Sequence, residues 1–351
     1  MSKSKHLTSL FLFGMILINA TSGLLAAPKS DRLVIAIGGV SIPHTAMCVA
    51  SEMKFFEKNG LKIEFKRVSS GFEALAAVQT GDAHVADAGI AVVAQTAQQG
   101  INVKAVTVGN GDSTGTVTTD NFFAIIGNKN KGLKSKDLSS LIGKKVGVPK
   151  GTVAHQHLYY ALKNNGYDPN KDIIMQHVSP ADLPTALQSG SVDAIACWEP
   201  MPLLALQMVS DSVQVYRGGN NMQYLFLYWM KPEFINKNPQ IVQKFVNAFA
   251  ESAQFSRKNH KKIVDIMVKS VKGLSRDVID QGVNYLNFDI RVSKATFEAA
   301  NQALEFAERT SGFEGKFNFG EHIYLDALNN TLKNKPQLFK DLQVIPENYK
   351  I

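Results

Sequence analysis

An indole and a carboxylate stand at the end of a short apolar run in the second half of the chain. The run VDAIACW, residues 192–198, is followed directly by Glu199 and Pro200. Short apolar runs bounded by turn residues are typical of buried strands, and small ligands of open parallel α/β sheets bind beyond the carboxyl ends of such strands. We therefore interpret Trp198 and Glu199 as ligand contacts. The indole is an aromatic wall, and the carboxylate pairs with an amine or bonds only to backbone.

Two glycine-containing loops stand at other strand ends, and each leads into a helix. The first turn of a helix has free N–H groups and carries the positive end of the helix dipole, so it favours anionic groups. Hydroxyl donors are expected near the same rim from the Ser- and Thr-rich segment 111–121 and from the helix start at 70–71. The candidate contacts in these loops and in this helix start are Ser41, Pro43, His44, Ser70, Gly71, Thr152, Val153, Ala154 and His155.

Each of these residues also has a purely structural interpretation. Trp198 is also typical of core packing, and the histidines are also typical of surface or helix-capping positions. The glycine turns can serve folding alone, and segment 111–121 can be a plain loop. The histidines show no spacing typical of a metal site, and no Ser-His-Asp, Cys-His or paired-carboxylate arrangement is legible. We therefore expect no catalytic residues, no metal and no cofactor. The joint position of the candidates at strand ends favours a binding site.

An internal repeat defines the elements that position these residues. Residues 69–89 align without a gap on residues 178–198, so the turn at Gly89 and Ile90 takes the place of Trp198 in the first copy. Strand and helix patterns alternate in both copies, which is typical of parallel α/β sheets. We expect two lobes, each a mostly parallel sheet flanked by helices, and a ligand cleft between them, because small-molecule sites favour such interfaces.

The lobes are expected to be interleaved along the chain. From residue 239 onward the pattern is mostly helical, and this tail must return to cover one sheet. The expected first lobe comprises residues 27–126 and 222–351, and the second comprises residues 127–221. Segments 127–137 and 216–223 are rich in glycine and asparagine and are the expected crossings, or hinges, between the lobes.

The N-terminus has the layout of a secretory signal peptide. Lysines at 3 and 5 precede an apolar run and then small residues, so we expect residues 1–26 to be cleaved from an exported protein. Loss of the two lysines takes the formal net charge from +8 to +6, spread thinly, which argues against nucleic-acid binding. Cys48 and Cys197 would lie on opposite sides of the cleft, so we expect free thiols rather than a disulfide that staples the lobes.

Three blocks of sequence resemble a known family. GIAVVAQTAQQGINVKAV, GKKVGVPKGTVAHQHL and ALQSGSVDAIACWEP are similar to the periplasmic solute-binding proteins of ABC transporters for aliphatic sulfonates, taurine and nitrate, in the superfamily that includes thiamine-pyrimidine precursor binders. The resemblance implies a two-lobed, hinge-closing fold and ligand contacts at residues 41–44, 152–155 and 198–199 and at Gly89 and Ile90. No arginine stands at a predicted rim position, and Lys150 is the obvious cation there.

Two classes of function follow from the resemblance. The first is a monomeric periplasmic receptor that captures a small organic solute, foremost an aliphatic sulfonate or a taurine-like anion, and delivers it to an inner-membrane permease. A thiamine-precursor pyrimidine and a nitrate-type anion are alternative ligands. The second class is an enzyme on the same scaffold, which the signal peptide and the lack of a cysteine-rich run disfavour. A ligand-sensing partner of a membrane receptor is a third interpretation.

Overall fold

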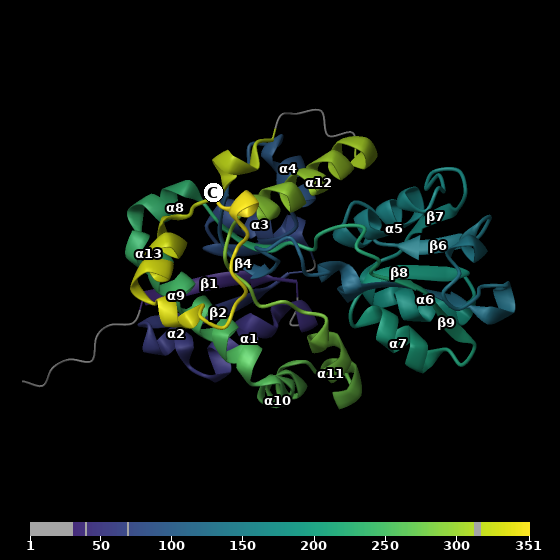
Figure 1. Ribbon diagram of the computed structural model, residues 1–351, viewed down its shortest axis with the longest axis horizontal. Coiled ribbons are helices and arrows are strands. Elements are labelled where there is room, and N and C mark those ends of the chain that lie inside the picture. Colours follow the sequence, from purple (N-terminus) through teal and green to yellow (C-terminus); the bar gives the residue numbers. More distant parts are fainter. Residues whose placement is uncertain (1–30, 39–40, 69, 312–316) are drawn as a thin grey trace, which may run out of the picture.

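The computed structural model describes residues 31–38, 41–68, 70–311 and 317–351, and its strands form two separate five-stranded sheets (Figure 1). The expected signal peptide lies outside the described residues. The first sheet has the order β2-β1-β3-β10-β4 and the second the order β7-β6-β8-β5-β9. The strands are β1 (Asp31–Ile37), β2 (Leu61–Arg67), β3 (Val85–Ala88), β4 (Lys104–Asn110), β5 (Phe123–Asn128), β6 (Lys145–Val148), β7 (Ile174–His177), β8 (Ala194–Trp198), β9 (Ser212–Arg217) and β10 (Phe226–Met230).

Each sheet is mixed in the same way, which reflects the internal repeat. In the first sheet β2, β1 and β3 pair parallel, and β10 runs antiparallel to β3 and β4. In the second sheet β7, β6 and β8 pair parallel, and β5 runs antiparallel to β8 and β9. The expected pair of mostly parallel α/β sheets is thus confirmed, with one reversed strand in each sheet. This reversed strand enters its sheet from the other lobe.

Helices cover both faces of each sheet. They are α1 (Thr45–Glu52), α2 (Phe55–Lys58), α3 (Gly71–Thr80), α4 (Ile90–Ala97), α5 (Val153–Asn164), α6 (Leu183–Ser189), α7 (Met201–Met208), α8 (Pro232–Lys237), α9 (Pro239–Lys258), α10 (His260–Ser270), α11 (Arg276–Asn284), α12 (Lys294–Ser311) and α13 (Asp326–Asn334). No helix in the described part of the chain is long and apolar enough to span a membrane.

The sequence specifies these helices locally. The Ser70 hydroxyl accepts the N–H of Glu73 at the start of α3, and Gly81 ends α3 with a left-handed φ of 87°. In α9 the apolar side chains recur at helical spacing, and Phe245 and Phe249 pack against Tyr228 of β10. The C-terminal tail therefore returns to cover the first sheet, as expected. Figure 1 also shows α11 and α12 extending from this lobe toward the second, where they contact α7 and α5.

The first crossing between the sheets lies earlier than expected. All residues of β5 pair within the second sheet, so the expected boundary at 126/127 falls inside a strand. The chain crosses at 111–122, and segment 127–137 lies at the far end of the second sheet, where Asn128 donates its N–H to the carbonyl of Asp193. The apolar pattern of the residues before 127 is compatible with a strand in either sheet. Only the strand pairing in the structure shows that this strand belongs to the second sheet. The second crossing, at 218–225, overlaps the expected segment 216–223.

One buried carboxylate joins the two crossings. Asp120, in the first crossing, is completely buried and accepts backbone N–H groups of the second crossing from Asn220, Asn221 and Met222, at 3.1, 2.7 and 3.4 Å. Beside it, the Thr119 hydroxyl accepts the N–H of Tyr224 at 2.6 Å. Charge-assisted hydrogen bonds of this kind are about twice as strong as neutral ones. We call this arrangement the Asp120 clamp, and it fixes where the lobes are joined.

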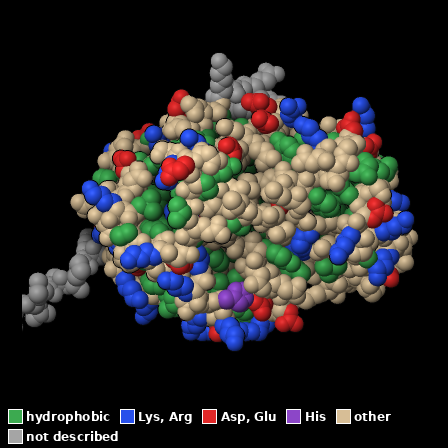
Figure 2. Space-filling view, in the orientation of Figure 1, with side chains coloured by type: hydrophobic (Ala, Val, Ile, Leu, Met, Phe, Trp, Pro, Cys, Tyr) green, Lys and Arg blue, Asp and Glu red, His purple; other side chains and the backbone are tan. Residues whose placement is uncertain are grey.

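The outer surface carries both signs of charge. On the face shown in Figure 2, lysine and arginine side chains are interspersed with aspartate and glutamate, and no continuous basic surface is present on that face. Several of these charges form exposed ion pairs, for example Arg32 with Glu64. Such pairs contribute little to stability. The charged residues near the crossings, such as Asp120, are instead buried.

We expect Asp120→Asn to lower the free energy of unfolding by about 2 kcal/mol, because hydrogen bonds to a buried charge are each worth roughly 1.5–3 kcal/mol and the amide keeps only part of them. Urea unfolding followed by circular dichroism measures the change. Asp182→Asn, at an exposed position, is the matched control and should shift the free energy of unfolding by less than about 0.5 kcal/mol. Equal changes in the free energy of unfolding for the two variants would contradict a stabilising role of the Asp120 clamp.

Candidate functional site

One predicted contact from each lobe, Gly89 and Val153, meets the other across the lobes. A Cβ atom built on Gly89, after β3, would lie 3.6 Å from Cγ1 of Val153 at the start of α5. A Cβ atom on Gly71 would lie 3.4 Å from Ala88, so the start of α3 packs on the same strand end. Residues 70–71, 89 and 153 are therefore together at the edge between the lobes. Ile90, the next predicted contact, is buried at the start of α4.

The first-strand loop turns its histidine inward. Ser41 precedes a short 3₁₀ helix (Ile42–His44) in which Pro43 is buried. The N–H of Ser41 donates to Nδ1 of His44 at 3.2 Å, and Nε2 of His44 lies 2.9 Å from Oδ2 of Asp87. Both contacts are satisfied by a neutral imidazole with its proton on Nε2. His44 therefore holds Asp87, a residue of β3 that the sequence analysis did not select.

The second-lobe loop forms the start of α5. The Thr152 hydroxyl donates to the carbonyl of Pro149 at 2.7 Å and accepts the N–H of Ala154 at 3.3 Å, so this hydroxyl is a helix cap. His155 accepts the N–H of Gly151 at Nδ1, and its ring meets Phe306 of α12 edge-on at 4.9 Å. The sequence allowed two interpretations of His155, a ligand contact or a surface or helix-capping histidine. The observed contacts agree with the second, structural interpretation. Ala154 is buried.

Contact with α12 places His155 between the lobes. Burial, followed by the positive charge of Lys150, lowers the pKa of His155 from its ordinary 6.5 to about 4. The ring is thus neutral at physiological pH. It contributes packing across the lobes and no charge for an anionic ligand.

Glu199 is not a free carboxylate. It is completely buried, with Oε1 2.6 Å from Nη2 of Arg217 and with Oε2 accepting the N–H of Leu203 at 3.2 Å. Burial raises its pKa, and the charge of Arg217 opposes this shift. The sequence left a ligand amine or backbone alone as the partner of Glu199, and neither alternative includes the arginine that this structure places beside it. Its partners are Arg217 and backbone, while Trp198 beside it is only half-buried and keeps an accessible surface.

Arg217 is the rim arginine that the sequence analysis missed. Arg217 is the last residue of β9, which lies next to β5, and β5 lies next to β8. This strand order brings Arg217 into direct contact with Glu199, although 18 positions separate the two residues in the sequence. Its Nη1 also donates to the carbonyl of Asn121 at 2.9 Å, and its guanidinium lies 4.5 Å from the centre of the Tyr285 ring. Arg217 therefore joins the second lobe to the first crossing and to the C-terminal tail.

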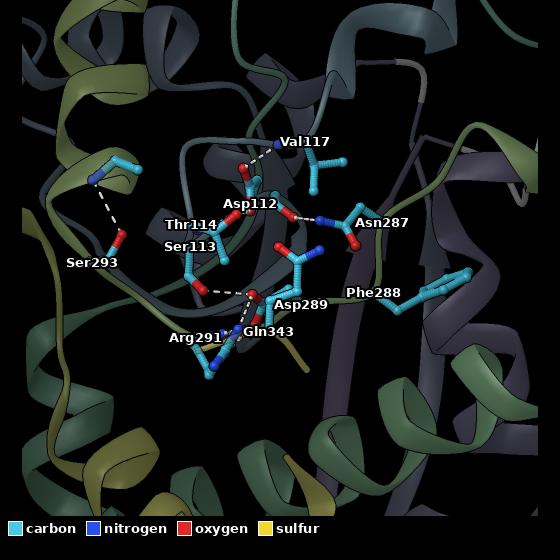
Figure 3. A network of polar contacts seen from close by, with 12 residues as sticks. Asp112, Ser113, Thr114, Val117, Asn287, Phe288, Asp289, Arg291, Ser293 and Gln343 are labelled. Atoms are coloured by element: carbon cyan, nitrogen blue, oxygen red, sulfur yellow. Dashed lines mark hydrogen bonds and ion pairs between the residues drawn. The ribbon is translucent and has the colours of Figure 1, made fainter. Parts of the chain in front are cut away.

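The hydroxyl-rich segment 111–121 does not supply free donors to the rim. Figure 3 shows Ser113 directed to Asp289 and Thr114 to Asp112, with hydrogen bonds of 2.5 and 2.7 Å. Asp289 also pairs with Arg291. The expectation of hydroxyl contacts to the ligand is wrong for these two residues. Ser113 anchors the first crossing to segment 287–293, and Thr114 holds the crossing's own turn through Asp112.

Both cysteines are buried and free, as expected. Burial raises the pKa of Cys48 to about 12 and raises that of Cys197 as well. A cavity of about 230 Å³ lies beside Cys48 and belongs wholly to the first lobe. It is lined by Ile37, His44, Met47, Cys48, Ser51, Glu52, Phe65 and Ser270. Of the predicted contacts only His44 reaches it.

We expect Arg217→Met to lower the free energy of unfolding by about 3–5 kcal/mol, because it leaves the buried Glu199 carboxylate without its compensating charge. The double variant Glu199→Gln/Arg217→Met removes both charges and should recover most of this loss. Urea unfolding of the wild type, both single variants and the double variant gives the coupling energy. Simply additive losses would show that the pair is not an energetic unit.

His155 makes stability depend on pH. Between pH 6.5 and about 4 the unfolded chain binds a proton at His155 that the folded chain does not, so the free energy of unfolding falls as the pH is lowered through this window. The contribution reaches at most about 3 kcal/mol, at 1.36 kcal/mol per pKa unit. We expect His155→Gln to reduce the difference between urea midpoints measured at pH 7 and pH 4.5. Parallel pH profiles of variant and wild type would refute this.

Comparison with known proteins agrees with this architecture. The taurine-binding periplasmic protein of Escherichia coli (strain K12) is 24% identical over 238 residues, which are 66% of this chain and 68% of that protein. The crystal structure of the periplasmic aliphatic sulphonate binding protein SsuA from Escherichia coli superposes with a TM-score of 0.71 at 22% identity, covering 85% of this chain and 92% of that one.

More distant structures share the fold as well. The nitrate-binding protein NrtA from Synechocystis PCC 6803 has a TM-score of 0.69 at 14% identity, covering 90% of this chain and 92% of that one. A desulfurization enzyme, DSZB, has a TM-score of 0.61 at 13% identity, covering 87% and 99%. The family described as NMT1/THI5 like matches residues 41–263. The chain belongs to this NMT1/THI5-like family of two-lobed proteins, as the sequence blocks indicated.

Proposed function

We propose that this protein is the substrate-binding component of an ABC importer and that it binds a small organic sulfonate between its lobes. The observation that carries the proposal is the meeting of Gly89 with Val153, which sets the end of β3 against the N-terminus of α5. The free N–H groups and dipole of that 12-residue helix favour an anionic group. Relatives named for taurine and for aliphatic sulfonates support this ligand class.

Closure of the lobes is the transport signal in this proposal. The tail helices already contact the second lobe through His155 with Phe306 and through Arg217 with Tyr285. A ligand that contacts both lobes shifts the hinge toward the closed form by its difference in affinity for the two forms. The closed monomer then docks on a membrane permease. Export through a cleaved signal peptide at residues 1–26, and hence a periplasmic location, belong to the same proposal.

Binding without catalysis is the version we favour. The two thiols are buried with raised pKa values, so neither is an activated nucleophile. His155 is directed to Phe306 and to Gly151, and His44 to Asp87. The shared fold of the desulfurization enzyme carries no information about activity here. Nitrate-type anions and aminopyrimidines remain the competing ligands, and a binding panel separates them.

Val153→Glu tests the site directly. A carboxylate in the first turn of α5 suits the helix dipole, so the fold is preserved, but it repels an anionic ligand. We expect calorimetric titration with taurine and ethanesulfonate to show at least tenfold weaker binding than in the wild type. Val153→Gln introduces a side chain of nearly the same shape as Val153→Glu but without the charge, so it should lose much less ligand affinity.

Nitrate and an aminopyrimidine complete the titration panel. Binding of the pyrimidine alone would replace the sulfonate assignment. Equal losses in Val153→Glu and Val153→Gln would show that charge at this position does not matter, and sulfonate binding unaffected by either variant would move the ligand away from α5.

A further inference from the structure

A buried carboxylate near the meeting point of the lobes has one oxygen without a partner. Asp87 is 8% exposed, and its Oδ2 is bound by His44 at 2.9 Å. Its Oδ1 is buried and has no hydrogen-bond partner among the residues that the structure describes. Buried carboxylate oxygens are normally satisfied, so an unpartnered one in a native fold needs an explanation.

The position of Asp87 relates it to the ligand edge. Asp87 lies in β3, two residues before Gly89, and its carbonyl oxygen would be 3.5 Å from a Cβ atom on Gly71. Its partner His44 belongs to the first-strand loop, which ends at the same edge. Asp87 therefore lies in the strand that ends at the residues through which the first lobe meets Val153.

Aromatic residues lie near Asp87 and its partner His44. Tyr228 is the register partner of Asp87 on β10, and Phe226 meets the His44 ring edge-on at 5.6 Å. The negative charge of Asp87 adds to the effect of burial in raising the pKa of Tyr224, which places that ring within electrostatic reach. Tyr224 in turn contacts Phe123 at the start of β5, so the group extends toward the second lobe. Aromatic faces together with a carboxylate are a favourable environment for an ammonium group.

The charge balance at the crossings singles out Asp87. Glu199 is compensated by Arg217, and Asp289 by Arg291. The carboxylate of Asp120 accepts backbone N–H groups on both oxygens. In the described part of the chain Asp87 has only His44 within ion-pair distance, and Nδ1 of that ring accepts the N–H of Ser41. Asp87 is thus a buried carboxylate that has no cationic side chain other than His44 beside it among the described residues, and one of its oxygens has no partner there.

We infer that the ligand carries an ammonium group as well as its acidic group, and that this ammonium donates to Oδ1 of Asp87. This inference rests on the proposed function and narrows it from sulfonates in general to zwitterionic aminoalkanesulfonates. The acidic end lies toward the N-terminus of α5, and the basic end lies toward β3. A simple alkanesulfonate leaves the Asp87 charge buried and unpaired, so it is the weaker ligand.

Taurine and 2-hydroxyethanesulfonate provide the test, because they differ only in the ammonium and hydroxyl groups. We expect wild-type protein to bind taurine at least tenfold more tightly in calorimetric titrations at pH 7. In Asp87→Asn this preference should fall to about threefold or less, through loss of taurine affinity. Thermal unfolding of each variant verifies the fold.

Glu199→Gln is the matched control, since it also neutralises a buried carboxylate at the junction of the lobes. It should leave the ratio of the two affinities unchanged, because Glu199 pairs with Arg217 rather than with the ligand. If Asp87→Asn does not fold, the wild-type ratio alone decides, and a ratio near one overturns the inference.

The outcomes separate the two levels of the proposal. Binding of both sulfonates with equal affinity overturns the Asp87 inference and leaves the sulfonate function standing. Binding of neither sulfonate to folded wild-type protein overturns the proposed function and the inference together. A preference for taurine that persists unchanged in Asp87→Asn shows that another group recognises the ammonium.

Discussion

Two chain crossings hold the lobes together, and a single buried carboxylate joins those crossings. Asp120 collects the backbone N–H groups of Asn220, Asn221 and Met222, so the two strands of chain that pass between the sheets are fixed to each other at one point. Polar groups buried this deeply are costly unless they are fully hydrogen-bonded. The arrangement therefore joins the two crossings to each other at one point between the sheets.

Other buried charges near the clamp fall into two groups. One group is internally neutralised: Glu199 with Arg217, and Asp289 with Arg291. These pairs anchor the strand ends and the first crossing, and each carboxylate has an arginine as its counter-charge. The second group contains Asp87, whose carboxylate is only half satisfied. We therefore assign a structural role to the first group and ligand recognition to the second, although all three acids are buried.

The sequence was sufficient for features that depend on local pattern. The internal repeat predicted two α/β lobes, and the cap at Ser70 and the glycine after α3 are where the motifs indicated. Features that depend on strand pairing were not predictable. The run that forms β5 has the same apolar pattern whichever sheet it joins, so the boundary and the first hinge were misplaced. Arg217 reaches Glu199 only because β9 pairs with β5, and Asp87 meets His44 across 43 residues. The only sequence signal for Asp87 was an acid inside a short buried strand.

The central claim is that a sulfonate bound between the lobes stabilises their closed arrangement. Spin labels attached through Lys62→Cys and Ile174→Cys, one exposed position in each lobe, would report the distance between the lobes by pulsed electron resonance. The two native thiols are buried with raised pKa values and should remain unlabelled. The account predicts that saturating taurine converts a broad distribution into a narrower one at shorter distance. A distribution that is unchanged by a ligand that calorimetry shows to be bound would contradict it.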